Sequence, residues 1–370
     1  MDFSPTEGQQ DLSALTREIL DDHVTADRLR AAEAEPDRFD RELWDALATA
    51  DILGATLPTE VGGSGFGLLE RCSVLTELGR AVAPVPYLSS VVAAAALARF
   101  GDAKQRDAWA RPAATGERIL TTAVTEGDQA RADRDFRGWR LDGVRTVVPA
   151  AGVADLVLIP ASTSDGTTVF LVSPDDPGVS IERQTLVDGD AAGRLSLDGV
   201  LLDDERVLGV PGDGDEIVEW TVHQATVGVC AHQLGVCERA LELTAEYARE
   251  RVQFDKPIGS FQAVTQRLAD AYVDVQAIRL TLWQAAWPPA DSTVHDGPVD
   301  IGTAKFWAAE AGHRVAHTAV HVHGGVGIDL DNEVHRYFTA AKRNEFTLGS
   351  ATDNLLRIGR ELAEHTAGEH

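Results

Sequence analysis

The stretch "YARERVQFDKPIGSFQAV" (Tyr247–Val264) separates two long helical patterns and sets the organisation of the C-terminal part of the chain. Arg251 and Phe254 lie three residues apart at the predicted end of the first helix, and a Pro-Ile-Gly turn precedes the second. A guanidinium can bind a phosphate with paired hydrogen bonds, while an aromatic ring packs on a planar base. The pair therefore suits the adenosine diphosphate half of a nucleotide cofactor. An interhelical ion pair with a core phenylalanine explains the same spacing equally well.

Helical periodicity continues on both sides of this stretch, over residues 215–254, 260–287 and 300–322. Helices of this length are stabilised mainly by burying an apolar stripe against neighbours, so the pattern predicts an antiparallel bundle of about four helices. The N-terminal part also has helical spacing, for example over 89–101, where Gly101 is the expected C-terminal cap.

Between about residues 116 and 213 the apolar period changes from 3.6 to 2, in short runs rich in Val, Leu and Thr. Turn sequences such as Ser-Asp-Gly-Thr, Asp-Asp-Pro-Gly and Leu-Asp-Gly separate the runs, which predicts a small antiparallel barrel or sandwich. The expected fold class is α+β, with an N-terminal helical domain (1–115), a β domain (116–213) and a C-terminal helical bundle (214–370).

Composition narrows the possible partners. The 370 residues include 33 Lys plus Arg against 59 Asp plus Glu, a formal charge of −26. This charge repels phosphate backbones and anionic lipid surfaces, so we expect neither a nucleic-acid nor a membrane partner. The N-terminus has no basic and apolar leader, which favours a cytoplasmic protein. Cys72, Cys230 and Cys237 are expected to be structural rather than catalytic.

Four histidines form a candidate metal site. His313, His317 and His321 are four residues apart on one helical stripe, with His323 just beyond, which is a spacing found among metal ligands. No acidic residue is interleaved with them, and a glycine-rich segment follows. A helix C-terminus lined by imidazoles is therefore the favoured interpretation, and no metal is predicted.

Two C-terminal stretches carry a family resemblance: residues 247–280 and "AVHVHGGVG" (319–327). With the helix–strand–helix order, they resemble the acyl-CoA dehydrogenase family over essentially the whole chain. In that family the two motifs cross a dimer interface and hold the adenine and pyrophosphate part of the neighbouring subunit's FAD. The resemblance thus implies FAD as cofactor and implicates six residues: Arg251, Gln253, Phe254, His321, Gly324 and Gly325. His321 stands where the family usually has Gln.

Other parts of the family pattern are missing. The run "TEGDQARAD" (125–133) keeps Thr125 and Glu126 but lacks the Pro and Ser of the family's flavin and substrate motif. In "VVPA" (147–150), Val147 and Pro149 replace the Trp and Thr that flank the flavin ring. The family's two positions for the catalytic base correspond to Leu348 and Ala225. Desaturation of an acyl thioester needs a base within reach of the Cα proton, so we expect no catalytic residue in this chain.

The remaining resemblance is to the base-lacking subunits of heterotetrameric (α2β2) dehydrogenases that desaturate steroid side-chain CoA esters in cholesterol-degrading bacteria. It implies a non-catalytic subunit that completes the FAD site of a catalytic partner, which would bind most of the acyl-CoA substrate. One alternative is a self-sufficient homotetramer with a displaced base such as Glu345 or Glu219. Another is a scaffold without flavin.

Overall fold

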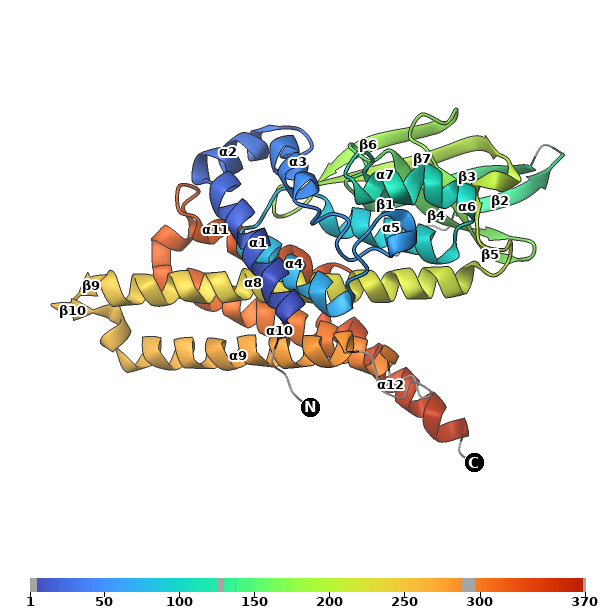
Figure 1. Cartoon of the computed structure of the whole chain (residues 1–370). Coiled ribbons are helices and arrows are strands. Elements are labelled where there is room, and N and C mark those ends of the chain that lie inside the picture. Colours follow the sequence, from blue (N-terminus) through green and yellow to red (C-terminus); the bar gives the residue numbers. More distant parts are fainter. Residues whose placement is uncertain (1–4, 125–129, 137, 288–296, 369–370) are drawn as a thin grey trace. The chain divides into compact units, whose positions relative to one another are not determined.

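A computed structural model describes residues 5–124, 130–136, 138–287 and 297–368 (Figure 1). Contacts group the chain into two compact units. Unit 1 comprises Met1–Ala26, Leu68–Ala83 and Thr226–His370, and unit 2 comprises Asp27–Gly67 and Pro84–Ala225. The long helix α8 (Gly214–Glu250) contributes residues to both units. The division into three sequential domains stays a prediction.

The helices of unit 2 precede its sheet in the sequence. They are α2 (Ala26–Ala34), α3 (Arg41–Thr49), η1 (Thr59–Val61), α5 (Tyr87–Phe100), α6 (Ala103–Gln105), η2 (Arg106–Ala110) and α7 (Arg111–Ala114). Asp40 caps α3 by accepting a hydrogen bond from the Leu43 amide. The predicted cap of α5 is confirmed, because the Gly101 amide donates to the Leu97 carbonyl.

The strands of unit 2 form one mixed sheet within the described residues. They are β1 (Leu120–Thr122), β2 (Ala130–Asp135), β3 (Gly138–Pro149), β4 (Leu156–Thr163), β5 (Gly166–Val172), β6 (Val179–Thr185), β7 (Ala191–Leu202) and β8 (Val207–Leu208). The order is β6-β7-β3-β2-β4-β5-β8, and β1 pairs with β4. The expectation of strands is confirmed, but the sheet is not wholly antiparallel, because β4 pairs in parallel with β1 and β2.

Two Leu-Asp-Gly sequences that were predicted as turns lie inside strands β3 and β7. The register shifts between Leu141 and Gly143, and Asp142 Oδ1 accepts a hydrogen bond of 2.8 Å from the Gly199 amide. Gly143 and Gly199 have φ of 142° and 61°. Glycine tolerates these angles, so it allows an irregularity within a continuous strand as readily as a turn.

Unit 1 contains a helical bundle. Its elements besides α8 are α1 (Glu7–His23), α4 (Leu68–Arg80), β9 (Val252–Gln253), β10 (Lys256–Pro257), η4 (Ile258–Ser260), α9 (Gln262–Ala286), α10 (Gly297–His323), η5 (Gly324–Ile328), α11 (Val334–Phe346) and α12 (Ala351–Gly368). Helix α10 packs against α9, α11 and α12. Helix α4 approaches α8 so closely that a Cβ on Gly235 would lie 1.9 Å from the Thr76 carbonyl oxygen. Within the described residues, no helix is both long and apolar enough for a membrane crossing.

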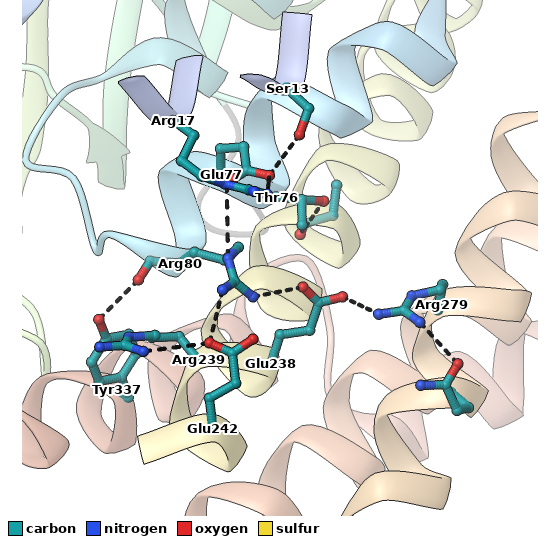
Figure 2. Close-up of polar contacts among 12 residues, drawn as sticks. Ser13, Arg17, Thr76, Glu77, Arg80, Glu238, Arg239, Glu242, Arg279 and Tyr337 are labelled. Atoms are coloured by element: carbon teal, nitrogen blue, oxygen red, sulfur yellow. Dashed lines mark hydrogen bonds and ion pairs between the residues drawn. The ribbon is translucent and has the colours of Figure 1, made fainter. Parts of the chain in front are cut away.

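A network of charges joins the helices of unit 1 (Figure 2). Arg80 on α4 donates to Glu238 at 3.0 Å and to Glu242 at 2.8 Å, both on α8. Glu77, whose side chain is 5% exposed, pairs with Arg17 of α1 at 2.7 Å. Ser13, Arg279 and Tyr337 complete the network. It therefore ties the N-terminal helices α1 and α4 to the C-terminal bundle.

Candidate cofactor-binding site

A short hairpin follows α8 and carries three of the predicted cofactor residues. β9 and β10 pair antiparallel with Gln253 opposite Lys256, and Phe254 and Asp255 form the turn. Both turn residues have positive φ, 53° and 63°, as a two-residue turn of type I′ requires. The helix was predicted to continue to Phe254, but α8 ends at Glu250. Arg251 and Phe254 therefore do not share a helix face.

The hairpin side chains extend away from the rest of unit 1. The Phe254 side chain is 86% exposed, and its ring meets the edge of Phe261 at a centroid distance of 6.1 Å. Arg251 and Gln253 are also exposed. Among the residues that the structure describes, the Arg251 guanidinium has no ion pair or hydrogen-bond partner. The interhelical ion pair with a core phenylalanine, considered from the sequence, is therefore wrong, and both groups are available to a ligand.

The second predicted motif lies where α10 ends. His321 is exposed, and Gly324 has φ of 64°, which favours glycine. A Cβ at Gly324 or at Gly325 would meet no atom within 4 Å. The backbone here is open on the side where a Cβ would stand, so a flat or bulky group could approach it closely.

A ring stack brings the two motifs together. Tyr247, four residues before Arg251, stacks on His323, one residue before Gly324, with centroids 4.3 Å apart and planes at 23°. His323 Nδ1 lies 2.8 Å from the Ala319 carbonyl, and burial lowers the pKa of the imidazole. The hairpin and the start of η5 therefore lie at the same end of the bundle (Figure 1).

The two positions that the resemblance assigns to a catalytic base carry no acid or base. Leu348 lies in the turn between α11 and α12 with φ of 59°, and Ala225 is a half-buried residue within α8. Neither side chain can accept a proton. The structure thus places a strained, aliphatic residue at the first position and a methyl group at the second.

Most of the carboxylates close in sequence to Leu348 and Ala225 form hydrogen bonds or ion pairs. Glu345 is 13% exposed and contacts Lys342 at 2.5 Å and His313 at 3.2 Å, so it is not a solvated helix-face residue. Asp353 accepts hydrogen bonds from the Ser350 amide and hydroxyl, and these bonds lower the pKa of the carboxyl. Glu219, whose side chain is 66% exposed, lies 3.9 Å from His223.

The segment 147–150, which the resemblance places beside the flavin ring, is irregular. The register between β3 and β7 shifts between Arg145 and Val148, and Val147 has φ of 55°. The Val147 amide donates to Gln184 Oε1 at 2.8 Å, and the Thr121 hydroxyl donates to the Pro149 carbonyl at 2.7 Å. Thr125 and Glu126 lie outside the described residues.

The histidine stripe divides into separate environments. His313 Nδ1 lies 3.0 Å from the Lys342 ammonium, and His317 stacks on His313 with centroids 4.3 Å apart. His321 is exposed, whereas His323 is buried against Tyr247. The positive charge of Lys342 beside His313 would repel a metal cation at this position. In the described part of the chain, no group of three or more His, Cys, Asp or Glu residues could hold a metal ion.

Lys305 is a buried charged residue that the sequence interpretation missed. It lies on α10 and its side chain is fully buried. A signal was present, because Lys305 falls on the apolar stripe of the helix together with Ala308 and Ala309. The strong helical pattern of that block concealed the exception.

Several known proteins are similar to this chain over most of its length. Family models match residues 6–117, as "Acyl-CoA dehydrogenase, N-terminal domain", and residues 212–363, as "Acyl-CoA dehydrogenase, C-terminal domain". Acyl-CoA dehydrogenase FadE27 of Mycobacterium tuberculosis is 50% identical over 99% of this chain and 100% of its own length. The chain is also similar to a chain in the crystal structure of the ChsE4-ChsE5 complex from the same species, with a TM-score of 0.93, 50% identity and coverage of 98% and 99%. A "Tcur3481-Tcur3483 steroid ACAD G363A variant" gives a TM-score of 0.91 and 42% identity, with the same coverage.

Proposed function

The chain belongs to the acyl-CoA dehydrogenase family, and we propose that it is the non-catalytic subunit of a heteromeric FAD-dependent member. The observation that carries this proposal is the contrast within the chain. Both positions for a base hold aliphatic residues, Leu348 and Ala225, while the side chains that would contact the cofactor remain exposed at one end of unit 1.

The exposed residues fit the adenosine diphosphate part of FAD. The Arg251 guanidinium would pair with a pyrophosphate oxygen, and the Phe254 ring would pack on the adenine. The open backbone at Gly324 and Gly325 would allow the pyrophosphate to approach, while Gln253 and His321 would donate hydrogen bonds. When bound, FAD supplies the acceptor for the hydride that leaves the acyl thioester.

The catalytic base would come from a partner chain. Removal of the Cα proton requires a group within hydrogen-bond reach, and neither family position here offers one. The partner would therefore bind the acyl-CoA and most of the flavin, in an α2β2 assembly with one FAD per heterodimer. The names of the ChsE4-ChsE5 and Tcur3481-Tcur3483 structures each contain two components. The Tcur3481-Tcur3483 structure is called a steroid ACAD. These names support steroid side-chain CoA esters as the substrate class.

The decisive experiment expresses this chain alone and together with a catalytic dehydrogenase chain from the same genome, then records native mass, flavin spectrum and acyl-CoA dehydrogenase activity. We expect a colourless, inactive lone chain and a yellow, active complex with one FAD per heterodimer. A yellow and active homotetramer of this chain would refute the proposal and indicate a displaced base. A complex without flavin at this chain's interface would indicate a scaffold.

The contacts of Glu345 and Glu219 bear on the alternative in which one of them acts as a displaced base. Glu345 is paired with Lys342 at 2.5 Å and is only 13% exposed, so using it as a base would require that ion pair to break. Glu219 is open to solvent but stands near His223. Glu345→Gln and Glu219→Gln should each leave the activity of the assembled complex within about twofold, which corresponds to less than about 0.5 kcal/mol.

A further inference from the structure

The ammonium of Lys305 lies between the end of one helix and the turn that follows it. Nζ donates to the carbonyl oxygens of Asn344 at 3.1 Å, Glu345 at 3.1 Å and Gly349 at 2.8 Å. A lysine ammonium has three donors, so these bonds use all of them. The first two acceptors belong to the last turn of α11, where carbonyl groups have no partner within the helix.

The backbone that Lys305 binds is strained. Leu348, next to Gly349, has φ of 59°, a conformation that a leucine adopts only when its surroundings enforce it. The Thr347 amide donates to the Arg343 carbonyl at 3.0 Å, and the Gly349 amide donates to the Phe346 carbonyl at 3.3 Å. Lys305 therefore holds the chain on both sides of the strained residue.

The ends of the turn are fixed by buried amides. Asn344 Nδ2 donates to Gln233 Oε1 at 2.9 Å, and Gln233 Nε2 donates to the Ala308 and Ala341 carbonyls. On the other side, Asn354 is fully buried and donates to the Gly349 and Ser350 carbonyls. Movement that follows from loosening Lys305 is therefore confined to the turn itself.

We propose that Lys305 is a positioning residue whose ammonium holds the turn Thr347–Ser350, with Leu348 in its left-handed conformation, and that loss of its proton releases the turn. A neutral amine has two donors and a lone pair, so one of the three carbonyls loses its hydrogen bond and faces that lone pair instead. The inference does not depend on the proposed function, because the contacts lie within unit 1.

Burial, rather than the charges around Lys305, leaves this proton weakly held. Cys230 on α8, Glu345 on α11, and Asp353 and Arg357 on α12 are the titratable or charged groups near it. Among the described residues, none of them forms an ion pair with Lys305. Burial therefore dominates, and it lowers the pKa of Lys305 to about 8.

The chain allows a direct test, because it contains only four lysines: Lys104, Lys256, Lys305 and Lys342. Protein labelled with ¹³C at lysine Cε and at leucine methyl groups would be titrated by NMR across the mildly alkaline range. The Lys305 signal is assigned by its loss in Lys305→Arg, and the Leu348 signal by its loss in Leu348→Ile. We expect the Lys305 signal to titrate at about pH 8, well below the ordinary lysine value of 10.5, with the Leu348 methyl signals moving at the same midpoint.

The variants separate positioning from simple packing. In Lys305→Arg the charge is retained at every pH examined, so the Leu348 signals should stay at their protonated-state positions. In Lys342→Arg, a control on α11, the Leu348 titration should be unchanged. The proposal is overturned if the Leu348 signals do not titrate in the wild-type chain, or if they titrate identically in Lys305→Arg. The test uses no uncharged variant such as Lys305→Met, so it stands even if that variant does not fold.

Discussion

The ring of Tyr247 lies 4.3 Å from the ring of His323, at an interplanar angle of 23°. These residues are distant in sequence, yet Tyr247 lies four residues before Arg251 and His323 lies one residue before Gly324. The stack thus links the last turns of α8 and α10, the helices that lead into the hairpin of β9 and β10 and into η5. Its loss should affect the geometry of the proposed site before it affects the fold.

Replacing Tyr247 with Leu tests this link. Leucine keeps much of the apolar bulk but removes the ring stack, which is worth about 0.5–1.5 kcal/mol beyond burial. We expect a decrease of about 1 kcal/mol in the free energy of unfolding and faster release of FAD from the assembled complex, measured by urea unfolding and flavin fluorescence. Tyr272→Leu, at a tyrosine that is 59% exposed on α9, is the control. Equal FAD release from both variants would contradict the link.

Replacing Arg251 with Ala tests the proposed phosphate contact. Loss of a charge-assisted hydrogen bond costs about 1.5–3 kcal/mol, so the complex should bind FAD roughly tenfold to a hundredfold more weakly. Arg249→Ala is the matched control, because Arg249 is also exposed and lies two residues earlier. FAD titration of the apo complex measures the effect. Unchanged affinity in Arg251→Ala, or an equal loss in both variants, would remove Arg251 from the site.

The titration of Lys305 should be visible in the pH dependence of the free energy of unfolding. Its folded pKa of about 8 lies below its ordinary value of 10.5, so the cost of burying the charge is present below about pH 8 and is relieved as pH rises towards 10.5. Between about pH 7 and pH 9, the wild-type chain should gain about 1 kcal/mol in unfolding free energy relative to Lys305→Met. Urea unfolding at each pH measures this difference. Parallel curves for the two proteins would show that Lys305 does not titrate as proposed.

The three cysteines should be unreactive in the folded chain. All are buried and unpaired, and burial raises the pKa of Cys72 and of Cys230 to about 12. The reactive thiolate is therefore scarce at neutral pH as well as inaccessible. Iodoacetamide followed by mass spectrometry should show labelling of these thiols only after unfolding in urea. Rapid labelling of the native protein at any of them would contradict the structural role.

The network around Arg80 should contribute strongly to stability. Arg80→Met leaves Glu238 and Glu242 without their shared partner, and these side chains are 15% and 43% exposed. Partial solvent screening reduces the expected loss to about 2–3 kcal/mol in unfolding free energy. Arg194→Met, which breaks an exposed pair with Glu182, should cost less than about 1 kcal/mol. Similar losses of unfolding free energy in Arg80→Met and Arg194→Met would contradict the expectation that the more buried ion pairs contribute more to stability.

Local periodicity predicted most elements but not all of their boundaries. The strand β2 was missed because "ARADRD" (130–135) has no β-branched or aromatic residue, and its pairing with β3 and β4 decides its conformation. The end of α8 was placed too late because the Tyr247–Phe254 stretch keeps helical spacing. The chain instead leaves the helix after Glu250 and forms the hairpin, in which Phe254 and Asp255 have positive φ.

The sequence by itself determined the helical and strand periods, the two C-terminal motifs, and the aliphatic residues at 348 and 225, because these are properties of neighbouring residues or of residue identity. Only the tertiary structure decided that Tyr247 meets His323, that β4 pairs in parallel with β1 and β2, and that Lys305 binds three carbonyl groups. Each of these depends on packing between segments distant in sequence. Local patterns specify which face of a segment is buried, but not which partner covers it.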